Sequence, residues 1–305
     1  MAAGLADNEY LADEGLATVI FLALALRRPL FLEGEAGVGK TEVAKVLSRW
    51  TGGELVRLQC YEGIDVAQAV YEWDYSRQLL HLRAAESRPA GGGGGAGAGA
   101  GGEVTADVED EIYSERFLIR RPLLSAIAPR TPDEAPRVLL VDEIDRADDE
   151  FEAFLLELLS DYSVTVPELG TFRAEVAPVV VITSNRTRDV HDALKRRCLY
   201  HWVEHPSFER EVEIIRLRAP EVSESLARQV AAAVEEVRAM GLYKPPGVAE
   251  TIDWAHALWT LGRAEVDEGA LDLTLGTVVK YREDAERVRA AGLGDLVGRS
   301  LLRSR

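Results

Sequence analysis

Two segments of the sequence combine residue types that bind phosphate and a divalent cation. The first, Gly34 to Thr41, reads GEAGVGKT and matches the pattern GxxxxGK[ST] at every fixed position. In this pattern glycines let backbone N–H groups point at a phosphate, the lysine neutralises it and the hydroxyl binds Mg²⁺. The sequence therefore predicts an ATP site formed by consecutive residues: Gly34, Glu35, Ala36, Gly37, Val38, Gly39, Lys40 and Thr41.

The residues on either side of this loop predict the geometry that phosphate binding requires. Pro29–Leu32 is a short apolar run typical of a buried strand, and a helix is expected to begin at Lys40. The N-terminal end of a helix carries partial positive charge and unpaired N–H groups, which favour an anion. An ordinary glycine-rich turn is the alternative, but the strand and the helix around it favour the phosphate site.

The second segment is a carboxylate pair, Asp142 and Glu143, which follows the apolar run Val138–Val141. Ligands of open α/β sheets bind at the carboxyl ends of the strands, so we expect this pair beside the phosphate loop. Asp142 would hold Mg²⁺ together with Thr41, and Glu143 would polarise a water for attack on the γ-phosphate. A helix N-cap with an exposed acidic neighbour is the alternative interpretation of the pair.

Acidic residues continue beyond this pair. We interpret Asp145, Asp148, Asp149 and Glu150 as the first turn of a helix that reaches Leu159, where acidic side chains complement the helix dipole.

Composition limits the classes of function. The 305 residues include 52 Asp and Glu against 35 Lys and Arg, so the net charge of −17 argues against nonspecific nucleic-acid binding. Two distant cysteines, Cys60 and Cys198, fit a reducing compartment, and we expect a cytoplasmic protein. The longest apolar stretch, Leu16–Leu26, is shorter than the roughly 20 residues of a membrane span and follows no basic leader. It predicts a buried helix, with neither a membrane span nor export.

Periodicity predicts an α/β protein with a parallel sheet, followed by an all-helical part. Strand-like runs alternate with helices up to residue 205, at 29–32, 55–58, 138–141 and 179–182. After Pro206 only helical periodicity remains, near 208–218, 222–240, 249–261 and 271–290. We therefore expect a nucleotide-binding αβα core at 1–205 and a helical lid domain at 206–305. Residues 88–102 are rich in glycine and are interpreted as an unpacked insertion in the core.

Two further segments, Val180–Asn185 and Asp192–Arg197, give the chain a resemblance to the AAA+ superfamily of P-loop ATPases. The resemblance implies that Asn185 orients the attacking water at the sensor-1 position. It also implies that Arg197, or alternatively Arg196, is an arginine finger that reaches a neighbouring subunit's site. An enzyme of this kind hydrolyses ATP with Mg²⁺ as a homo-oligomer, expected to be a hexameric ring.

Within AAA+ the chain resembles the MoxR branch, because Ser163–Thr171 lies where that branch carries a β-hairpin insert, expected at about 163–175. Leu58–Asp65, Tyr71–His81 and Arg196–Trp202 are similar to the CoxD-like subgroup, which matures carbon monoxide dehydrogenase and related molybdenum enzymes. The resemblance implies a chaperone-like ATPase that acts beside a von Willebrand factor A domain partner on a client metalloenzyme. Where the superfamily often has a sensor-2 arginine, this chain has Lys244–Thr251, and only Lys244 is a candidate.

Other interpretations stay open at this level. A nucleotide-dependent interaction scaffold would not need Glu143 for hydrolysis, and a P-loop kinase would share the loop but need neither Asn185 nor Arg197. The alternating aromatics Tyr71, Trp73 and Tyr75 would either line the channel of a ring or pack against the core.

Overall fold

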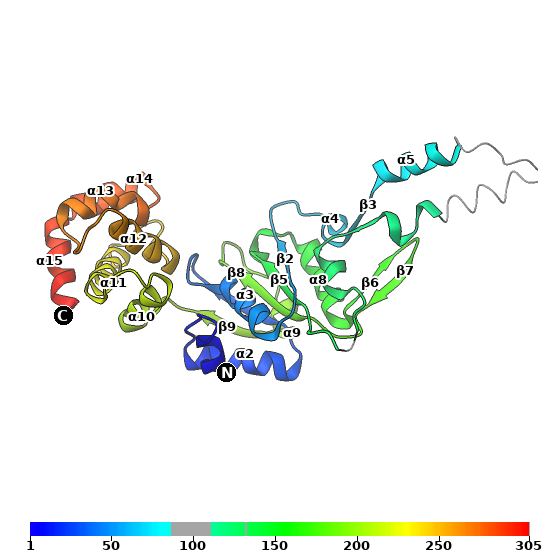
Figure 1. Ribbon diagram of the computed structural model, residues 1–305, viewed down its shortest axis with the longest axis horizontal. Helices are drawn as coiled ribbons and strands as arrows, with labels where there is room; N and C mark the ends of the chain where they lie inside the picture. The colour runs from blue at the N-terminus through cyan, green and yellow to red at the C-terminus, as the bar shows by residue number, and fades with distance from the viewer. Residues whose placement is uncertain (87–110, 132, 305) are drawn as a thin grey trace, which may run out of the picture.

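Five parallel strands form the central sheet (Figure 1). The computed structural model describes residues 1–86, 111–131 and 133–304. The sheet has the strand order β2-β5-β8-β1-β9, and every neighbouring pair is parallel. The strands are β1 (Leu30–Gly34), β2 (Leu55–Gln59), β5 (Val138–Asp142), β8 (Val179–Ser184) and β9 (Leu199–Val203). This confirms the predicted parallel α/β class. β9 is a fifth strand that the apolar pattern did not indicate, because Tyr200, His201 and Trp202 interrupt it.

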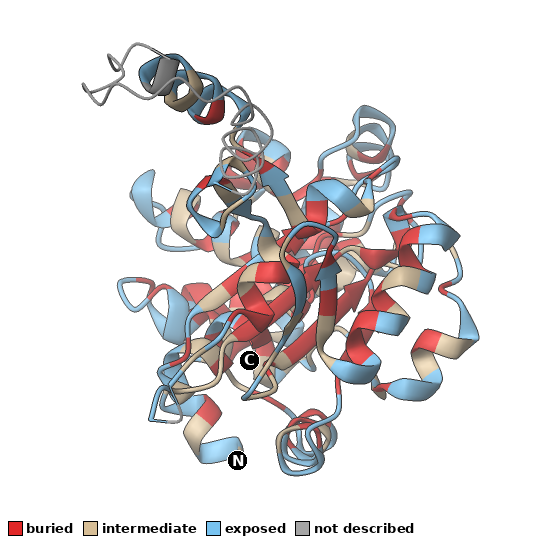
Figure 2. Cartoon of the chain, turned by 90° about the vertical axis from the view of Figure 1, so that its right-hand side faces the viewer, coloured by how far each residue is buried: buried red, intermediate tan, exposed pale blue. Residues whose placement is uncertain are grey.

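Apolar side chains alternate between the two faces of the sheet, so each face has a core of its own. Phe31, Leu139 and Ile182 belong to one core, while Leu30, Leu140 and Val181 belong to the other. Strands buried on both faces read as continuous apolar runs, which is why they were predictable from sequence. Figure 2 shows that buried positions predominate in the central sheet and that exposed positions predominate on the outer sides of the helices around it.

Helices cover both faces. The core of the first face includes residues of α4 (Val66–Val70), α7 (Pro122–Ile127), α8 (Asp149–Asp161) and α9 (Asp192–Arg197). That of the second includes residues of α1 (Ala2–Ala6), α2 (Glu14–Leu26) and α3 (Lys40–Thr51). The predicted buried helix at 16–26 is present within α2 but is only partly buried, because Leu16 and Ile20 are buried while Phe21 and Leu26 are more than half exposed.

Two small antiparallel sheets lie outside the central one. β3 (Tyr71–Trp73) pairs with β4 (Leu118–Arg120), and β6 (Ser163–Val166) pairs with β7 (Gly170–Arg173) as a hairpin. Helix α5 (Tyr75–Glu86) follows β3 and projects from the body (Figure 1). The predicted glycine-rich insertion at 88–102 lies outside the described residues.

The aromatic alternation around β3 is mainly a packing feature. Trp73 is 6% exposed and meets Tyr71 and Tyr113 edge to face, with ring centroids 6.2 and 5.2 Å apart. Tyr75 is exposed at the start of α5. The interpretation that all three aromatics line a channel is therefore wrong, since the indole of Trp73 is buried in the core.

The described residues after Pro206 form helices α10 (Phe208–Arg218), α11 (Glu224–Arg238), α12 (Val248–Thr260), α13 (Glu268–Val278), α14 (Arg282–Ala290) and α15 (Leu293–Arg303). Trp254 is fully buried among them, and its indole N–H donates to Thr274 Oγ1 at 2.7 Å. This helical part lies at the opposite end of the molecule from α5 (Figure 1).

One predicted helix of this part is wrong. The run 271–290 forms two helices, α13 and α14, because the backbone of Val279 is extended. Within α14, Asp284 accepts the N–H groups of Tyr243 and Lys244 at 2.8 and 3.0 Å. Helix α15 was not predicted.

Within the described ranges no helix has both the length and the apolarity to cross a bilayer. Cys60 and Cys198 are buried free thiols, and burial raises the pKa of each to about 12. A protonated buried thiol is a poor nucleophile, so the chemistry of this chain lies elsewhere.

Candidate functional site

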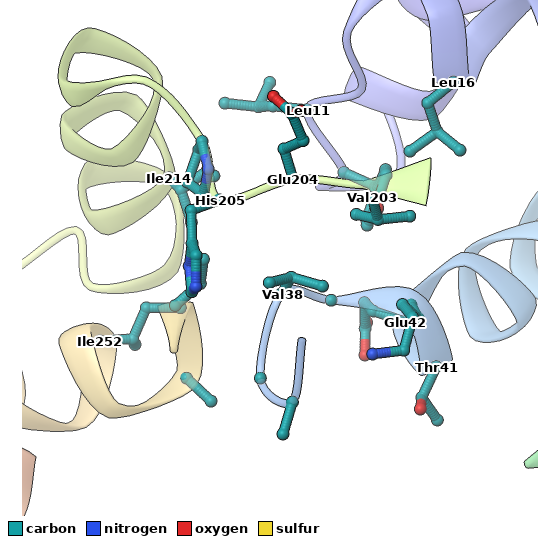
Figure 3. Close-up of a pocket in the computed structure, with 18 of the residues that line it drawn as sticks. Leu11, Leu16, Val38, Thr41, Glu42, Val203, Glu204, His205, Ile214 and Ile252 are labelled. Carbon is teal, nitrogen blue, oxygen red and sulfur yellow. The ribbon is translucent and has the colours of Figure 1, made fainter. Parts of the chain in front are cut away.

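A cavity of about 790 Å³ lies where the sheet's carboxyl edge meets the N-terminal segment, α10 and α12 (Figure 3). Its lining includes the loop before α3, Asp142 and Glu143, together with the apolar side chains of Leu11, Val203, Ile214, Val248 and Ile252. Figure 3 shows Val38 and Thr41 on one side of the cavity and His205 and Ile252 on another. A cleft of this volume, lined by apolar side chains and a few polar groups, is typical of a small-molecule or cofactor site.

The phosphate loop has the predicted strand–loop–helix geometry. β1 ends at Gly34 and α3 begins at Lys40. Gly37 and Gly39 have φ values of 80° and 95°, a left-handed conformation that favours glycine. At Gly34 a Cβ atom would lie 2.3 Å from the carbonyl oxygen of Val203, so the first glycine is required by the close approach of β9.

Lys40 is held inside this loop. Its ammonium group donates to the carbonyl oxygens of Gly34 and Glu35 at 2.9 and 2.6 Å, and the residue is 5% exposed. Burial lowers the pKa of Lys40 to about 8, against the opposing charges of Asp145 and Asp142. A phosphate anion beside the ammonium would favour its charged form.

Thr41 and Asp142 lie together, as the cation-site prediction requires. Thr41 Oγ1 donates to Asp142 Oδ1 at 2.9 Å, and Asp142 is 3% exposed. The same carboxylate accepts from Thr183 Oγ1 at 2.6 Å and from Arg57 Nη2 at 2.6 Å. Thr183 and Arg57 were missed by sequence reasoning because each belongs to a neighbouring strand, and only the strand order brings them to Asp142.

Glu143 follows β5 and is surrounded by polar side chains. Its backbone is left-handed, with φ 58°, and its N–H donates to Thr183 Oγ1 at 3.0 Å. Asn185 Nδ2 donates to one carboxylate oxygen at 3.3 Å, and Gln59 Nε2 donates to the other at 3.0 Å. Glu143 does precede a short 3-10 helix, Ile144–Arg146, as the N-cap alternative expected, but its side chain makes no capping hydrogen bond there. The cap of α8 is Asp148, which accepts the N–H of Phe151 at 2.8 Å.

Asp145 does not lie in the helix where it was predicted. It is 3% exposed and lies outside α8, so its assignment to the helix's first turn is wrong. Its carboxylate accepts the N–H groups of Asn185 and Thr187 at 3.2 and 2.8 Å, and the hydroxyl of Thr187 at 2.7 Å. Asp145 thereby fixes the segment that carries Asn185.

Arg196 and Arg197 lie at the end of α9 and do not line the large cavity. Both are exposed, and Arg197 donates to Ser160 Oγ. They line a second hollow of about 350 Å³ together with Arg27 and Arg28. The structure thus gathers the loop, Asp142, Glu143 and Asn185 at one cavity and leaves the two predicted finger arginines outside it.

The helical part contributes residues that sequence reasoning did not select. Arg210 and Arg218 of α10 line the cavity, and Arg218 lies 3.6 Å from Glu42. Lys244, the sequence candidate for sensor 2, is exposed and does not line it. His205, in the link between β9 and α10, lies 3.1 Å from Glu35 through Nε2.

The start of α12 touches the phosphate loop directly. The N–H of Val248 donates to the carbonyl oxygen of Gly37 at 2.9 Å. Gly247 packs so closely that a Cβ there would lie 2.7 Å from Gly37 Cα. No charge pattern in the sequence indicated this backbone contact.

The model of the AAA domain, dynein-related subfamily, matches residues 29–198, which include the loop, the carboxylate pair, Asn185 and both arginines. This chain belongs to that AAA domain family.

No curated protein matches the sequence. The RuvB Holliday junction branch migration motor of Thermotoga maritima is 15% identical, with a TM-score of 0.46 over 90% of this chain and 72% of that chain. A Cytophaga hutchinsonii protein provisionally described as an ATPase is 13% identical, with a TM-score of 0.44 over 98% of this chain and 92% of that chain. Both likenesses are too distant to carry an argument about function.

Membership of the AAA domain family implies nucleotide binding, and the residues at the cavity fit Mg-ATP. The loop presents Lys40 and the N-terminal end of α3 to a phosphate chain. The paired oxygens of Thr41 and Asp142 suit Mg²⁺, which prefers hard oxygen ligands and keeps several waters. The apolar side chains in the lining, such as Leu11, Ile214 and Ile252, suit a planar base.

Proposed function

We propose that this AAA domain protein hydrolyses ATP, and that it is a MoxR-type ATPase close to the CoxD-like subgroup. The observation that carries the hydrolytic part is the contact of Asn185 with Glu143, beside the pair Thr41 and Asp142. A carboxylate and an amide that face the same small volume can hold a water for in-line attack on a terminal phosphate. A scaffold that only binds nucleotide would have no use for this arrangement.

Each residue has a distinct role in the proposal. Lys40 binds the β- and γ-phosphates, and Thr41 and Asp142 hold Mg²⁺. Arg57 donates to Oδ2 of Asp142 and so holds that carboxylate in place. Mg²⁺, when bound, neutralises charge on the phosphates. Glu143 accepts the proton of the attacking water, and Asn185 fixes the direction of its carboxylate. The phosphate-loop residues Gly34 to Gly39 hold the phosphate chain through their backbone.

The finger arginines act on a neighbouring copy. Arg196 and Arg197 are exposed and line a different hollow from the cavity of their own subunit, which leaves that side of α9 open to a second subunit's phosphate. A finger supplied in trans is worth ~10³–10⁵ in rate in related phosphoryl transfer. The proposed active form is accordingly a homo-oligomeric ring, with Arg197 as the first candidate and Arg196 as the second.

The finer function rests on resemblance. We propose that residues 1–205 are the core domain, that the hairpin insert at about 163–175 belongs to it, and that 206–305 are a lid. The contact of Val248 with Gly37 gives the lid a direct route to the loop that holds phosphate. The proposed client is a molybdenum-containing metalloenzyme, reached with a von Willebrand factor A domain partner in a hexameric assembly.

Mixing two inactive variants tests the shared site. Lys40→Ala removes phosphate binding in its own subunit but leaves Arg197 intact, and Arg197→Ala does the reverse. We expect little phosphate release from either variant alone and clear recovery in the mixture. Some interfaces of the mixture then combine Lys40 of an Arg197→Ala subunit with Arg197 of a Lys40→Ala subunit. A mixture no more active than its components would exclude a site completed between subunits and would favour a monomeric phosphotransferase.

A further inference from the structure

The two finger arginines lie on α9, a helix of six residues whose C-terminal end is exposed. A short helix gains little stability by itself, so the direction of its last side chains depends on what holds it. Two charged residues from the segment around β1 contact α9, and neither has a role in the site described above. The inference drawn from them rests on the proposed action of Arg197, or Arg196, in a neighbouring subunit.

Arg28 holds the C-terminal end of α9. Its guanidinium donates to the carbonyl oxygens of Arg196 and Arg197 at 2.8 and 3.2 Å. A third, longer contact reaches the carbonyl oxygen of Cys198 at 3.5 Å. The last carbonyls of a helix have no partner inside the helix, and a cation there is favoured by the helix dipole. Arg28 therefore fixes the backbone of both finger candidates.

Glu33 holds α9 through a second contact. It is 3% exposed and lies in β1, directly before the first glycine of the phosphate loop. Lys195 of α9 places its ammonium 3.3 and 3.4 Å from the two carboxylate oxygens of Glu33. Tyr200 also donates to this carboxylate at 2.9 Å, and Ser184 lies at 3.4 Å. A buried polar group is costly unless it is hydrogen-bonded, and these three side chains supply the partners of Glu33.

One contact comes from Arg28, just before the strand that leads into the phosphate loop, and the other comes from Glu33 in the strand itself. Arg28 and Glu33 flank the first residues of β1, and Gly34, which follows Glu33, accepts from Lys40. β1 also pairs with β9, which follows α9 in the chain. The finger helix is thus attached to the element that carries the subunit's own phosphate loop.

We propose that Arg28 and Glu33 are positioning residues that set the direction of the finger arginines toward the neighbouring subunit's phosphate. Arg28 acts through the carbonyl end of α9, and Glu33 acts through Lys195. Neither touches nucleotide. Loss of either contact lowers turnover at the neighbour's site and leaves nucleotide affinity at the subunit's own site unchanged.

The test uses the full chain and compares Arg28→Ala with Arg27→Ala. Arg27 is the adjacent exposed arginine at the same hollow, and within the described ranges its side chain has no hydrogen bond or ion pair. Arg27→Ala therefore removes the same charge as Arg28→Ala without breaking a contact to α9. We expect Arg28→Ala to lower kcat ~10- to 100-fold with little change in KM for ATP, because a misplacement of about 1 Å can cost ~10²-fold. Arg27→Ala should stay within about twofold of the wild type, as for most surface substitutions.

Mixing separates positioning from a general loss of structure. Arg28→Ala subunits keep their own phosphate site, so added Lys40→Ala subunits with intact fingers should raise activity above the sum of the two proteins alone. The proposal would be overturned if the activity of the mixture equals the sum of the activities of the two variants alone. A wild-type kcat in Arg28→Ala would overturn it as well. If Arg28→Ala does not fold, Arg28→Gln, which keeps one donor for the carbonyls, is tested in the same mixture.

The double variant Glu33→Gln with Lys195→Met gives an independent check. It removes both charges and leaves no unpaired ion, and the same fall in kcat and the same recovery on mixing are expected. An unchanged kcat would overturn the role of Glu33. Failure of the proposed function is a different result, because then the wild type releases no phosphate or Arg197→Ala and Arg196→Ala are both as active as the wild type.

Discussion

The side-chain amide of Asn185 donates to the carboxylate of Glu143 at 3.3 Å, across the carboxyl ends of the paired strands β8 and β5. Asn185 is itself fixed by the bond from its N–H to Asp145. Glu143 sits in a left-handed conformation that is uncommon for a residue with a side chain. Backbone strain of this kind persists where the surrounding structure imposes it, and it is frequent at functional sites.

Replacing Asn185 with Ala should slow hydrolysis and leave binding intact. The amide directs the Glu143 carboxylate, and within the described part of the chain it has no hydrogen bond to a phosphate-loop residue. Loss of one directed polar group at a reacting centre costs ~10²–10³ in kcat. Steady-state phosphate release and nucleotide affinity, measured on one preparation, check this. Gln59→Ala removes the other amide on Glu143 and is the comparison. Equal turnover in Asn185→Ala and the wild type would contradict the role given to Asn185.

Replacing Gly247 with Ala should separate the helical part from the phosphate loop. A Cβ at this position would lie 2.7 Å from Gly37 Cα and 2.9 Å from the carbonyl oxygen of Ala36, and backbone cannot move aside as a flexible side chain can. We expect a loss of ~1–3 kcal/mol in the free energy of unfolding, the usual cost of overpacking. Thermal unfolding measures it.

The matched control for this variant is Gly276→Ala in α13, where a Cβ meets no atom within 4 Å. Alanine in a helix interior is favoured over glycine by ~0.5–1 kcal/mol, so this variant should be slightly stabilised. If both substitutions shift the unfolding temperature in the same direction, the close contact with Gly37 does not exist in solution.

Replacing Glu211 with Ala should destabilise the helical part strongly. Glu211 is 1% exposed, and Arg238 of α11 donates to both carboxylate oxygens at 2.6 and 2.7 Å. Thr251 of α12 donates to it at 2.7 Å, so one carboxylate joins three helices. Removing one partner of a buried ion pair costs ~3–5 kcal/mol, because the other charge stays buried without a partner. Denaturant unfolding measures this loss.

Glu213→Ala is the control on the same helix, because Glu213 pairs with Arg210 at the surface. An exposed pair of this kind contributes ~0–1 kcal/mol. Comparable losses for Glu211→Ala and Glu213→Ala would show that the buried pair has no special part in holding α10, α11 and α12 together.

The sequence predicted those parts of the fold that depend on local pattern. Gly34 to Thr41 was recognisable because its residues are consecutive, and four of the five central strands were visible as apolar runs buried on both faces. The break in the helix at 271–290 was not visible, since no Pro or Gly marks Val279. Asp284, in the helix after the break, has its hydrogen-bond partners Tyr243 and Lys244 far away in sequence, and no local pattern shows that contact.

The same limit applies to the candidate site. Thr183, Arg57 and Gln59 reach the carboxylate pair only because β2, β5 and β8 are neighbours in the sheet. Asp145 reads as part of an acidic helix start until the fold places it under the Asn185 segment. Glu33 reads as the polar residue that follows the apolar run 29–32, and its partner Lys195 lies on an element that no local pattern connects to it.

The central claim is that Glu143 activates water for ATP hydrolysis at the cavity beside Gly34 to Thr41. The most direct test measures phosphate release and ATP binding for the wild type and Glu143→Gln at equal concentrations of assembled protein. The amide keeps the size of the side chain but cannot accept the proton, so we predict unchanged or tighter ATP binding with turnover reduced by at least ~10²-fold. Phosphate release from Glu143→Gln at the wild-type rate would contradict the account.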